Sequence, residues 1–180
     1  MKFAALLALL AVGAIAVQDI PEPTSPLDQH EWLHQLVGDW NVTTEATMEP
    51  SAEPMKLEST ESVRSVGGLW IVGEGSASFG GTPFTSILTL GYDPGKEAFV
   101  GTWIDSMQTH MWIYEGSLDG AKKVLTLNTE GPLFGDPSKT ASYRDVIEMK
   151  DADHRTLTSS LKGEDGTWTT FMRAEYRRKK

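Results

Sequence analysis

The chain has 180 residues, contains no cysteine and carries a formal net charge of −9 at pH 7. This length is enough for one domain with a sizeable hydrophobic core. The absence of cysteine excludes both a disulfide framework and a lipid anchor attached to a cysteine. The acidic balance argues against a nucleic-acid partner, which requires a basic surface, and weakens any case for binding to anionic membranes.

The first sixteen residues have the composition of a secretory signal peptide. Lys2 gives a short positive start, residues 3–12 form an apolar run rich in Ala and Leu, and residues 14–16 (AIA) form a small-residue cleavage site. The apolar run is too short to span a bilayer and no second hydrophobic segment follows, so we expect no stable membrane insertion. We therefore predict a signal peptide over residues 1–16 and an exported bacterial protein, periplasmic or secreted. An uncleaved membrane anchor is the alternative.

A short leader and one helix are predicted next. Residues 17–26 contain three prolines and form an extended leader. In the helix that follows, Ser25 can cap the start, Pro26 suits the first position and Gly38 marks the end. Its apolar side chains are concentrated on one side, which predicts a short plug helix packed against the rest of the domain.

After Gly38 the apolar period changes from near 3.6 to about 2, which is typical of strands. Turn-forming pairs such as Gly67-Gly68 divide the rest of the chain into runs of similar length. One longer connection, residues 131–139, separates two of these runs. The predicted strands are 38–48, 56–66, 69–79, 83–92, 97–107, 110–118, 122–130, 140–150, 155–163 and 167–177.

Short strands joined by tight turns pair in chain order, which gives an antiparallel meander. A long meander leaves two exposed edges unless it closes on itself. We therefore predict an all-β fold: a single up-and-down antiparallel barrel of about ten strands over residues 27–180, with one short N-terminal plug helix. A barrel of this width leaves room for one small ligand. A two-sheet sandwich is the alternative fold, although it normally needs longer crossovers.

The segment Gly38-Asp39-Trp40, the short helix before it and an arginine on the last strand resemble the pattern of the calycins, which include lipocalins and fatty-acid-binding proteins. The resemblance implies that Trp40 closes one end of the barrel and that a late basic side chain packs over its ring. Arg173 or Arg177 would fill this role. A guanidinium over an indole face stabilises a fold by roughly 0.5–2 kcal/mol.

Longer segments resemble a narrower family, the bacterial domain of unknown function 1579. The resemblance covers nearly all of the chain after the leader and implies a calycin-like barrel without implying an activity. The matching segments are 30–33 (HEWL), 36–40 (LVGDW), 90–94 (LGYDP), 101–107 (GTWIDSM), 114–116 (YEG), 143–148 (YRDVIE) and 151–155 (DADHR).

Residues 30–34 (HEWLH) match H-E-x-x-H, the zinc-protease pattern in which two histidines one helical turn apart hold zinc and the glutamate acts as base. Zinc at His30 and His34 is one interpretation. The other is a plug helix that turns its polar His and Glu side chains outward and its leucines inward. We favour the plug helix, because too few residues precede the motif to build a zinc-protease domain and no third ligand follows at a recognised spacing.

Large aromatic and charged side chains on the predicted strands are the candidates for a ligand pocket. Alternate residues share one face of a strand, so Trp103 lies on the same face as Asp105, while Tyr143 lies opposite Arg144. Charged groups that point into a lumen must be paired. The alternation does not tell which face is the inner one, and each aromatic side chain can also be core filler. The candidate residues are Trp103, Asp105, His110, Trp112, Tyr114, Tyr143 and Arg144.

These features support four functions. The first, which we favour, is a non-enzymatic binder of a small, mostly apolar molecule in the barrel lumen. The second is an enzyme that uses Asp105, Arg144 and His110 for acid–base chemistry. The third is a haem or metal barrel, with His110 as haem ligand, as in some related ten-stranded haem barrels. The fourth is a scaffold with a filled core; the sequence indicates no oligomeric state.

Overall fold

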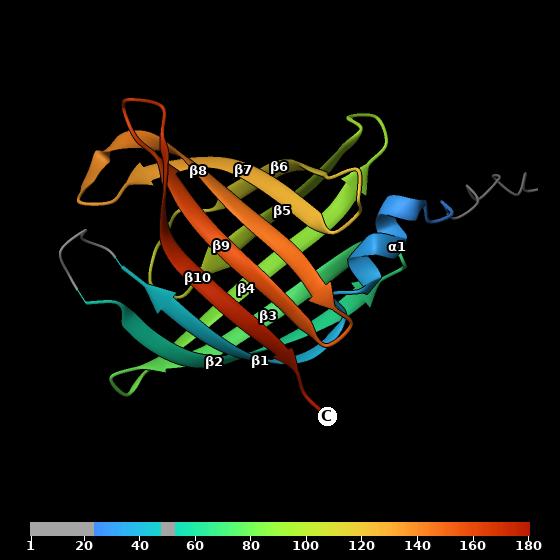
Figure 1. Cartoon of the computed structure of the whole chain (residues 1–180), viewed down its shortest axis with the longest axis horizontal. Helices are drawn as coiled ribbons and strands as arrows, with labels where there is room; N and C mark the ends of the chain where they lie inside the picture. Colours follow the sequence, from blue (N-terminus) through green and yellow to red (C-terminus); the bar gives the residue numbers. More distant parts are fainter. Residues whose placement is uncertain (1–23, 48–52) are drawn as a thin grey trace, which may run out of the picture.

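A computed structural model describes residues 24–47 and 53–180 of the chain (Figure 1). The predicted signal peptide, residues 1–16, and residues 17–23 of the predicted leader lie outside the described residues. Within the described part, one helix and ten strands follow one another in the expected order. They are α1 (Asp28–His34), β1 (Gly38–Ala46), β2 (Met55–Val66), β3 (Trp70–Phe79), β4 (Thr82–Asp93), β5 (Ala98–Asp105), β6 (Trp112–Leu118), β7 (Val124–Leu133), β8 (Asp136–Asp151), β9 (His154–Lys162) and β10 (Trp168–Arg178).

The ten strands form a closed antiparallel barrel (Figure 1). Each strand pairs with the next one along the chain, and β1 pairs with both β2 and β10. Val42 of β1, for example, lies opposite Ser59 of β2 and Tyr176 of β10. The predicted all-β up-and-down barrel is confirmed, and the two-sheet sandwich is excluded because one continuous ring of strands contains every sheet pairing.

Side chains along each strand alternate between the lumen and the solvent. In β7, Leu125 and Leu127 are buried, whereas the next residue, Asn128, lies on the outer face and is exposed. In β8 the same alternation turns Tyr143 inward, so that its neighbour Arg144 lies on the outer face. The inner face, which the sequence pattern alone did not identify, is therefore the face of Tyr143.

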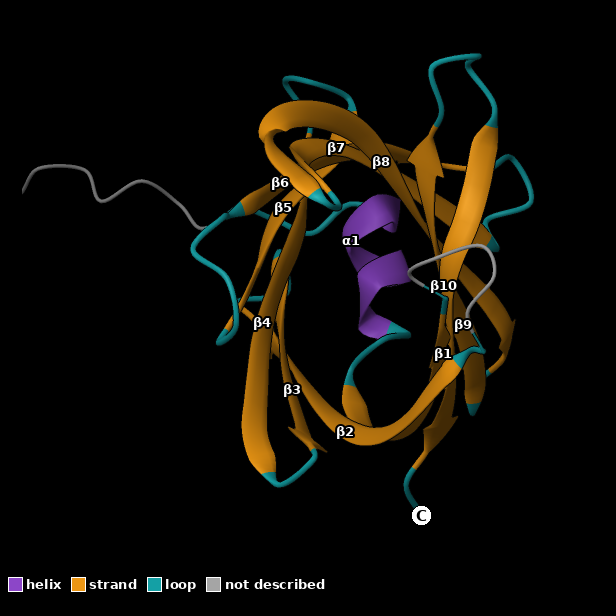
Figure 2. Cartoon of the chain, turned by 90° about the vertical axis from the view of Figure 1, so that its left-hand side faces the viewer, coloured by secondary structure: helices purple, strands orange, loops and turns teal. Residues whose placement is uncertain are grey.

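The helix α1 lies across one end of the barrel (Figure 2). Trp32 and Leu33 of α1 are buried, and the Trp32 indole Nε1 donates a hydrogen bond to the Lys122 carbonyl oxygen at 2.9 Å. We call this the closed end of the barrel; the open end is the opposite one, where β1 ends at Ala46 and β2 begins at Met55. No helix in residues 24–47 and 53–180 is long and apolar enough to cross a membrane.

The start of α1 differs from the prediction. The residue at the N-cap is Leu27 rather than Ser25, and His30 Nδ1 accepts a hydrogen bond from the Leu27 backbone N–H at 2.9 Å. Because Nδ1 accepts, Nε2 carries the proton and donates to the Tyr92 carbonyl oxygen, 3.2 Å away. The plug helix is confirmed, but the expected outward orientation of His30 is wrong: the ring is buried and ties α1 to β4, while His34 remains half-exposed.

The connection predicted over residues 131–139 is instead mostly strand. Strands β7 and β8 extend into it and meet at a tight turn, in which Gly135 has a φ of 82°. A bulge in the β7–β8 pairing follows Pro132. Proline is tolerated here because β7 is not paired with β6 beyond Asn128, so that side of the strand has no ladder hydrogen bond to lose.

Trp40 fills the closed end of the barrel. Its side chain is completely buried, and its indole Nε1 donates to the Leu36 carbonyl oxygen at 2.9 Å. The guanidinium carbon of Arg178 lies 4.2 Å from the Trp40 ring centroid. The same guanidinium donates to the carbonyl oxygens of Val37 (2.6 Å) and Gln35 (2.9 Å). A late arginine therefore joins the last strand to the chain that leads from the helix into β1.

The residue that fills this role corrects the expectation. Arg173 and Arg177 are both exposed, because the odd-numbered residues in this part of β10 face away from the lumen. Arg178 lies opposite Trp40 in the register between β1 and β10. Gly38 makes room for it: Gly38 has a φ of 128°, and a Cβ at this position would lie 2.4 Å from Arg178 Nη1. The space over the indole ring is thus available to Arg178 alone of the three arginines.

Candidate functional site

The barrel encloses a cavity of about 370 Å³. Inward-facing aliphatic and aromatic side chains make up most of its wall. Toward the open end, aromatic rings meet edge to face: Phe79 with Phe84 at 5.3 Å and Phe134 with Phe171 at 5.1 Å between centroids. The apolar side chains of the wall include Val42, Leu57, Leu88, Trp103, Leu127, Ile147, Leu157 and Phe171.

Arg155 lies at the floor of the cavity, next to the closed end. Its side chain is almost fully buried and forms an ion pair with Glu61, while its guanidinium carbon lies 3.7 Å from the Tyr176 ring centroid and 4.9 Å from that of Trp40. A buried guanidinium requires a counter-charge, which Glu61 supplies. Burial raises the pKa of the Tyr176 phenol and keeps it neutral. The floor therefore carries no net charge.

A second polar pair lies on the wall of the cavity. The Tyr114 hydroxyl donates to Asp145 Oδ2 at 2.6 Å. Burial raises the pKa of Asp145 above its ordinary value of 3.8, although hydrogen bonds from Ser159 and Tyr114 oppose this effect. Burial also raises the pKa of the Tyr114 hydroxyl. The protonated, uncharged form of Asp145 is thus favoured more than in an exposed aspartate.

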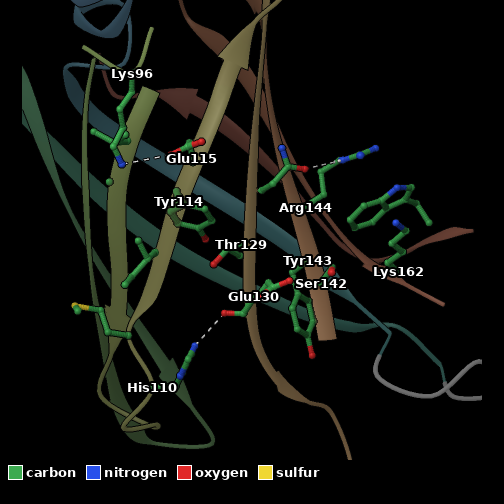
Figure 3. Close-up of a pocket in the computed structure, with 16 residues that line it drawn as sticks. Lys96, His110, Tyr114, Glu115, Thr129, Glu130, Ser142, Tyr143, Arg144 and Lys162 are labelled. Carbon is green, nitrogen blue, oxygen red and sulfur yellow. Dashed lines mark hydrogen bonds and ion pairs between the residues drawn. The ribbon is translucent and has the colours of Figure 1, made fainter. Parts of the chain in front are cut away.

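The barrel wall opens between β6 and β7, near the open end (Figure 3). The hydrogen-bonded pairing of these strands stops at Glu115 and Asn128, so β6 before Glu115 and β7 after Asn128 are not paired with each other. A groove of about 710 Å³ lies over this break. Tyr114, Thr129 and Tyr143 line both the groove and the central cavity. We call this break in the wall the notch.

Charged side chains of both signs frame the outer side of the notch (Figure 3). On one side, Lys96 Nζ lies 3.4 Å from Glu115 Oε2. On the other side, Arg144 Nε donates to Asn128 Oδ1 at 3.3 Å, and its guanidinium carbon lies 4.0 Å from the Trp168 ring centroid. Lys162 Nζ lies 5.9 Å from the same ring centroid, so one side of the rim carries an acid–base pair and the other carries two cationic groups.

Three buried side-chain polar atoms have no hydrogen-bond partner within residues 24–47 and 53–180: Trp112 Nε1, Thr129 Oγ1 and Arg155 Nε. Trp112 and Thr129 are each 7% exposed and line the cavity beside the notch. Leaving a buried donor or acceptor unpaired costs about 1–3 kcal/mol. A hydrogen-bond partner for any of these atoms would therefore stabilise the protein.

Four of the seven predicted pocket residues line the cavity: Trp103, Trp112, Tyr114 and Tyr143. Trp112 packs edge to face against Tyr143, with 4.9 Å between the ring centroids. The Tyr143 hydroxyl donates to the Pro132 carbonyl oxygen at 2.7 Å. The structure thus brings these four aromatic side chains to one lumen, and their role in binding stays a prediction.

The other three predicted pocket residues, Asp105, His110 and Arg144, lie outside the cavity wall. Asp105 ends β5, and its carboxylate accepts hydrogen bonds from two backbone N–H groups of the following turn. Arg144 faces outward because its neighbour Tyr143 faces inward, and His110 lies at the notch. These three groups therefore do not meet in the lumen, which the acid–base hypothesis would require.

The histidines singled out as metal ligands have other contacts. Both ring nitrogens of His30 are hydrogen-bonded to backbone groups, and His34 Nδ1 lies 3.4 Å from Glu31 Oε2 at the surface. His110 packs edge to face on Trp112, with 4.9 Å between centroids, and its role as a haem ligand stays a prediction. Among the described residues, no group of three or more His, Asp or Glu side chains is placed to hold a metal ion.

The polar groups deepest in the barrel were not among the predicted site residues. Glu61, Arg155 and Thr129 are the main examples. Phasing each strand on its apolar residues would have found two of them: Glu61 precedes the buried Val63 by two residues, and Arg155 precedes the inward-facing Leu157 by two. A charged residue at an inward position of a predicted strand is therefore the sequence signal for this site.

Comparisons with known proteins give a family of unknown function and a likeness of fold to a solved structure. Residues 25–178 match the family model described as "Protein of unknown function (DUF1579)". No curated protein matches the sequence. The crystal structure of Rv2717c from M. tuberculosis aligns with a TM-score of 0.54 and 15% identity, over 87% of this chain and 100% of that one, which is a likeness of fold alone. A redesigned β-barrel aligns over the same shares with a TM-score of 0.45 and 9% identity.

Proposed function

The chain belongs to the DUF1579 family, and from its barrel geometry we propose that it binds a small, mostly apolar molecule in the lumen. The observation that carries the proposal is the cavity of about 370 Å³ with its largely apolar wall. Small-molecule sites are typically concave, roughly 300–1,000 Å³ in volume and mostly apolar, with a few polar groups that orient the ligand. The lumen has this size and this composition.

The distribution of large and small side chains supports a binder over a filled scaffold. Filled protein interiors have few voids larger than a water molecule. Here Gly75 and Ala77 of β3 and Ser86 of β4 line the cavity from one side, and the aromatic rings of Trp112 and Tyr143 line it from the other. Larger side chains on β3 and β4 would fill this space. Because the wall is largely apolar, we expect water in the cavity to be displaced favourably by an apolar molecule.

The proposal can be tested with Nile red, a neutral dye whose fluorescence rises in apolar surroundings. We expect the purified protein to bind the dye with a stoichiometry of one, seen both by fluorescence titration and by native mass spectrometry. The variant Ser86→Trp should abolish binding, because Ser86 faces the cavity opposite Gly75, which offers the new ring no competing side chain. Thr85→Trp is the matched control, because Thr85 is exposed on the same strand.

The two variants separate a lumen site from a surface site. If Ser86→Trp stays folded, shown by an unchanged circular dichroism spectrum, and still binds Nile red as well as Thr85→Trp does, the dye lies outside the lumen and the proposal fails. A wild-type protein that does not bind the dye at all also contradicts it. The filled-scaffold alternative then becomes the better account.

We also propose that the protein works outside the cytoplasm. The support is the pattern of residues 1–16, with Lys2, an apolar run and the A-I-A segment, together with a cysteine-free sequence that needs no particular redox compartment. Expression of the full chain in a bacterium should yield a periplasmic or secreted form that begins at Val17. A cell-associated protein of full mass would contradict this proposal.

A further inference from the structure

The two unpaired lumen atoms beside the notch lie on neighbouring strands and on the same face of the wall. Trp112 Nε1 belongs to β6 and Thr129 Oγ1 to β7. If the β6–β7 register is continued past Glu115 and Asn128, Thr129 falls opposite Tyr114 and Trp112 falls opposite Gly131. Both Trp112 and Thr129 line the cavity, one on each side of the break in the wall.

The local structure holds the indole of Trp112 in this place. Gly131 has no side chain, and a Cβ there would lie 2.5 Å from the Trp112 ring, so the glycine is what lets the indole lie against β7. On its other faces the ring packs against His110 and Tyr143, each with 4.9 Å between centroids. None of these neighbours supplies an acceptor to the indole N–H, which has no partner among the described residues.

The charges of the lumen are compensated without a ligand. Arg155 is paired with Glu61, while burial raises the pKa of Asp145 and favours its uncharged form, which accepts a hydrogen bond from Tyr114. No other Lys, Arg, Asp or Glu of the described residues lines the cavity. A carboxylate ligand would therefore be buried without a free counter-charge, which is strongly unfavourable. An uncharged ligand meets no such penalty.

We infer that the ligand is uncharged and presents a carbonyl or hydroxyl oxygen to Trp112 Nε1 and Thr129 Oγ1. This inference rests on the proposed lumen binding and narrows it to a ketone, ester, amide or alcohol with a mostly apolar body. An indole N–H only donates a hydrogen bond, so the ligand atom it meets must be an acceptor. The Thr129 hydroxyl can donate to the same oxygen or accept from a ligand hydroxyl. The rest of the ligand contacts the apolar wall.

Two molecules of nearly equal size test the inference: benzophenone, which has a carbonyl oxygen, and diphenylmethane, which has a methylene group in its place. Their dissociation constants are measured by displacement of Nile red. Both Thr129→Val and Trp112→Phe should shift the ratio of the two constants about fivefold toward diphenylmethane, the loss of one hydrogen bond. Thr126→Val, the same change on the outer face of β7, should leave the ratio unchanged. Diphenylacetate, the charged analogue, should bind more weakly than benzophenone.

A stability measurement separates a binding role from a structural one. Because the Thr129 hydroxyl is buried without a partner, Thr129→Val should leave the midpoint of urea unfolding of the ligand-free protein unchanged or raise it, while it weakens benzophenone binding. A structural hydroxyl would lower the midpoint on removal. This second readout does not depend on how well Trp112→Phe folds.

The outcomes distinguish this inference from the proposal on which it rests. If benzophenone, diphenylmethane and the dye all bind but the ratio is the same in Thr129→Val, Trp112→Phe and Thr126→Val, the lumen is a binding site and the inference is wrong. Tighter binding of diphenylacetate than of benzophenone overturns it too. If none of the neutral probes binds, the proposed function fails and the inference fails with it.

Discussion

The two ends of the barrel differ in whether their buried polar groups have hydrogen-bond partners. At the closed end, most polar groups are paired: Trp40 is hydrogen-bonded and stacked, Arg178 donates to backbone carbonyls, and the charge of Arg155 is neutralised by Glu61. Only Arg155 Nε has no partner there among the described residues. Beside the notch near the open end, the pairing of β6 and β7 stops and buried polar atoms of Trp112 and Thr129 have no partner in the described chain.

The difference shows that one continuous wall of strands can have well-paired buried polar groups at one end and unpaired buried polar groups near the other. Paired and stacked groups contribute stability, and their removal leaves an uncompensated charge or a cavity. Unpaired buried groups cost stability until something binds them. We therefore expect substitutions at the closed end to lower the free energy of unfolding strongly, and substitutions beside the notch to affect binding more than stability.

Replacement of the tryptophan at each end gives the largest expected effect. Trp40→Ala should lower the free energy of unfolding by about 4 kcal/mol, because the ring is completely buried and densely contacted. Trp103→Ala should cost less than half as much, because Trp103 borders the existing cavity and is only partly buried. Urea unfolding followed by circular dichroism measures both. Equal losses would remove the distinction between the two ends.

The buried ion pair gives the next largest effect. Glu61→Leu should destabilise the fold by about 3 kcal/mol, because it leaves the Arg155 guanidinium buried without a counter-charge. The double variant Glu61→Leu with Arg155→Met removes both charges and should recover most of this loss. A double variant that loses the sum of the two single changes would show that the charges act independently and that the floor is not a compensated pair.

The arginines of β10 give a smaller effect and check which one closes the barrel. Arg178→Ala should lower the free energy of unfolding by about 1–2 kcal/mol through the lost hydrogen bonds and the lost contact with Trp40. Arg173→Ala should change it by less than about 0.5 kcal/mol, because its ion pair with Glu175 is exposed. A larger loss of stability for Arg173→Ala than for Arg178→Ala would show that Arg178 is not the residue that closes the barrel.

The smallest effect concerns the pH dependence of stability through Asp145. Burial raises the pKa of this carboxyl in the folded protein above its ordinary value of 3.8. The protonated carboxyl therefore contributes its full stability below about pH 3.8, and this contribution is lost as the pH rises through the folded-state pKa. Asp145→Asn should therefore gain stability relative to wild type as the pH rises above about 4. Tyr114 and Ser159, the neighbours on β6 and β9, are unchanged in the variant. Parallel urea midpoints at all pH values would contradict the raised pKa.

The sequence predicted the barrel better than the site, and there is a physical reason. Strand alternation and glycine turns such as Gly67-Gly68 are local properties, and they place the ten strands within a few residues. The choice of Arg178 over Arg173 depends on register across β1 and β10, which no local pattern contains. The same holds for the ion pair of Glu61 with Arg155, whose partners are far apart in the sequence.

The notch depends on an even less local property. Each of its strands has an ordinary strand sequence, and only the end of pairing at Glu115 and Asn128 separates them. Gly131 and Pro132 predict a loop because both residues are typical of turns. The structure places them in β7, where the edge toward β6 is unpaired and tolerates them. Trp112, Tyr114 and Tyr143 line the cavity because large inward aromatic side chains follow the alternation, and their role in binding stays a prediction.

The most direct test of lumen binding uses the photochemistry of benzophenone, which inserts into nearby C–H bonds on irradiation. The protein is irradiated with bound benzophenone, digested and mapped by mass spectrometry, with Ser86→Trp as the control that should lose the adducts. We expect the adducts on inward-facing side chains of the cavity wall, such as Leu127 of β7 and Ile147 of β8. Adducts confined to exposed side chains such as Met107 and Ile113, and equally abundant in Ser86→Trp, would contradict a binding site in the lumen.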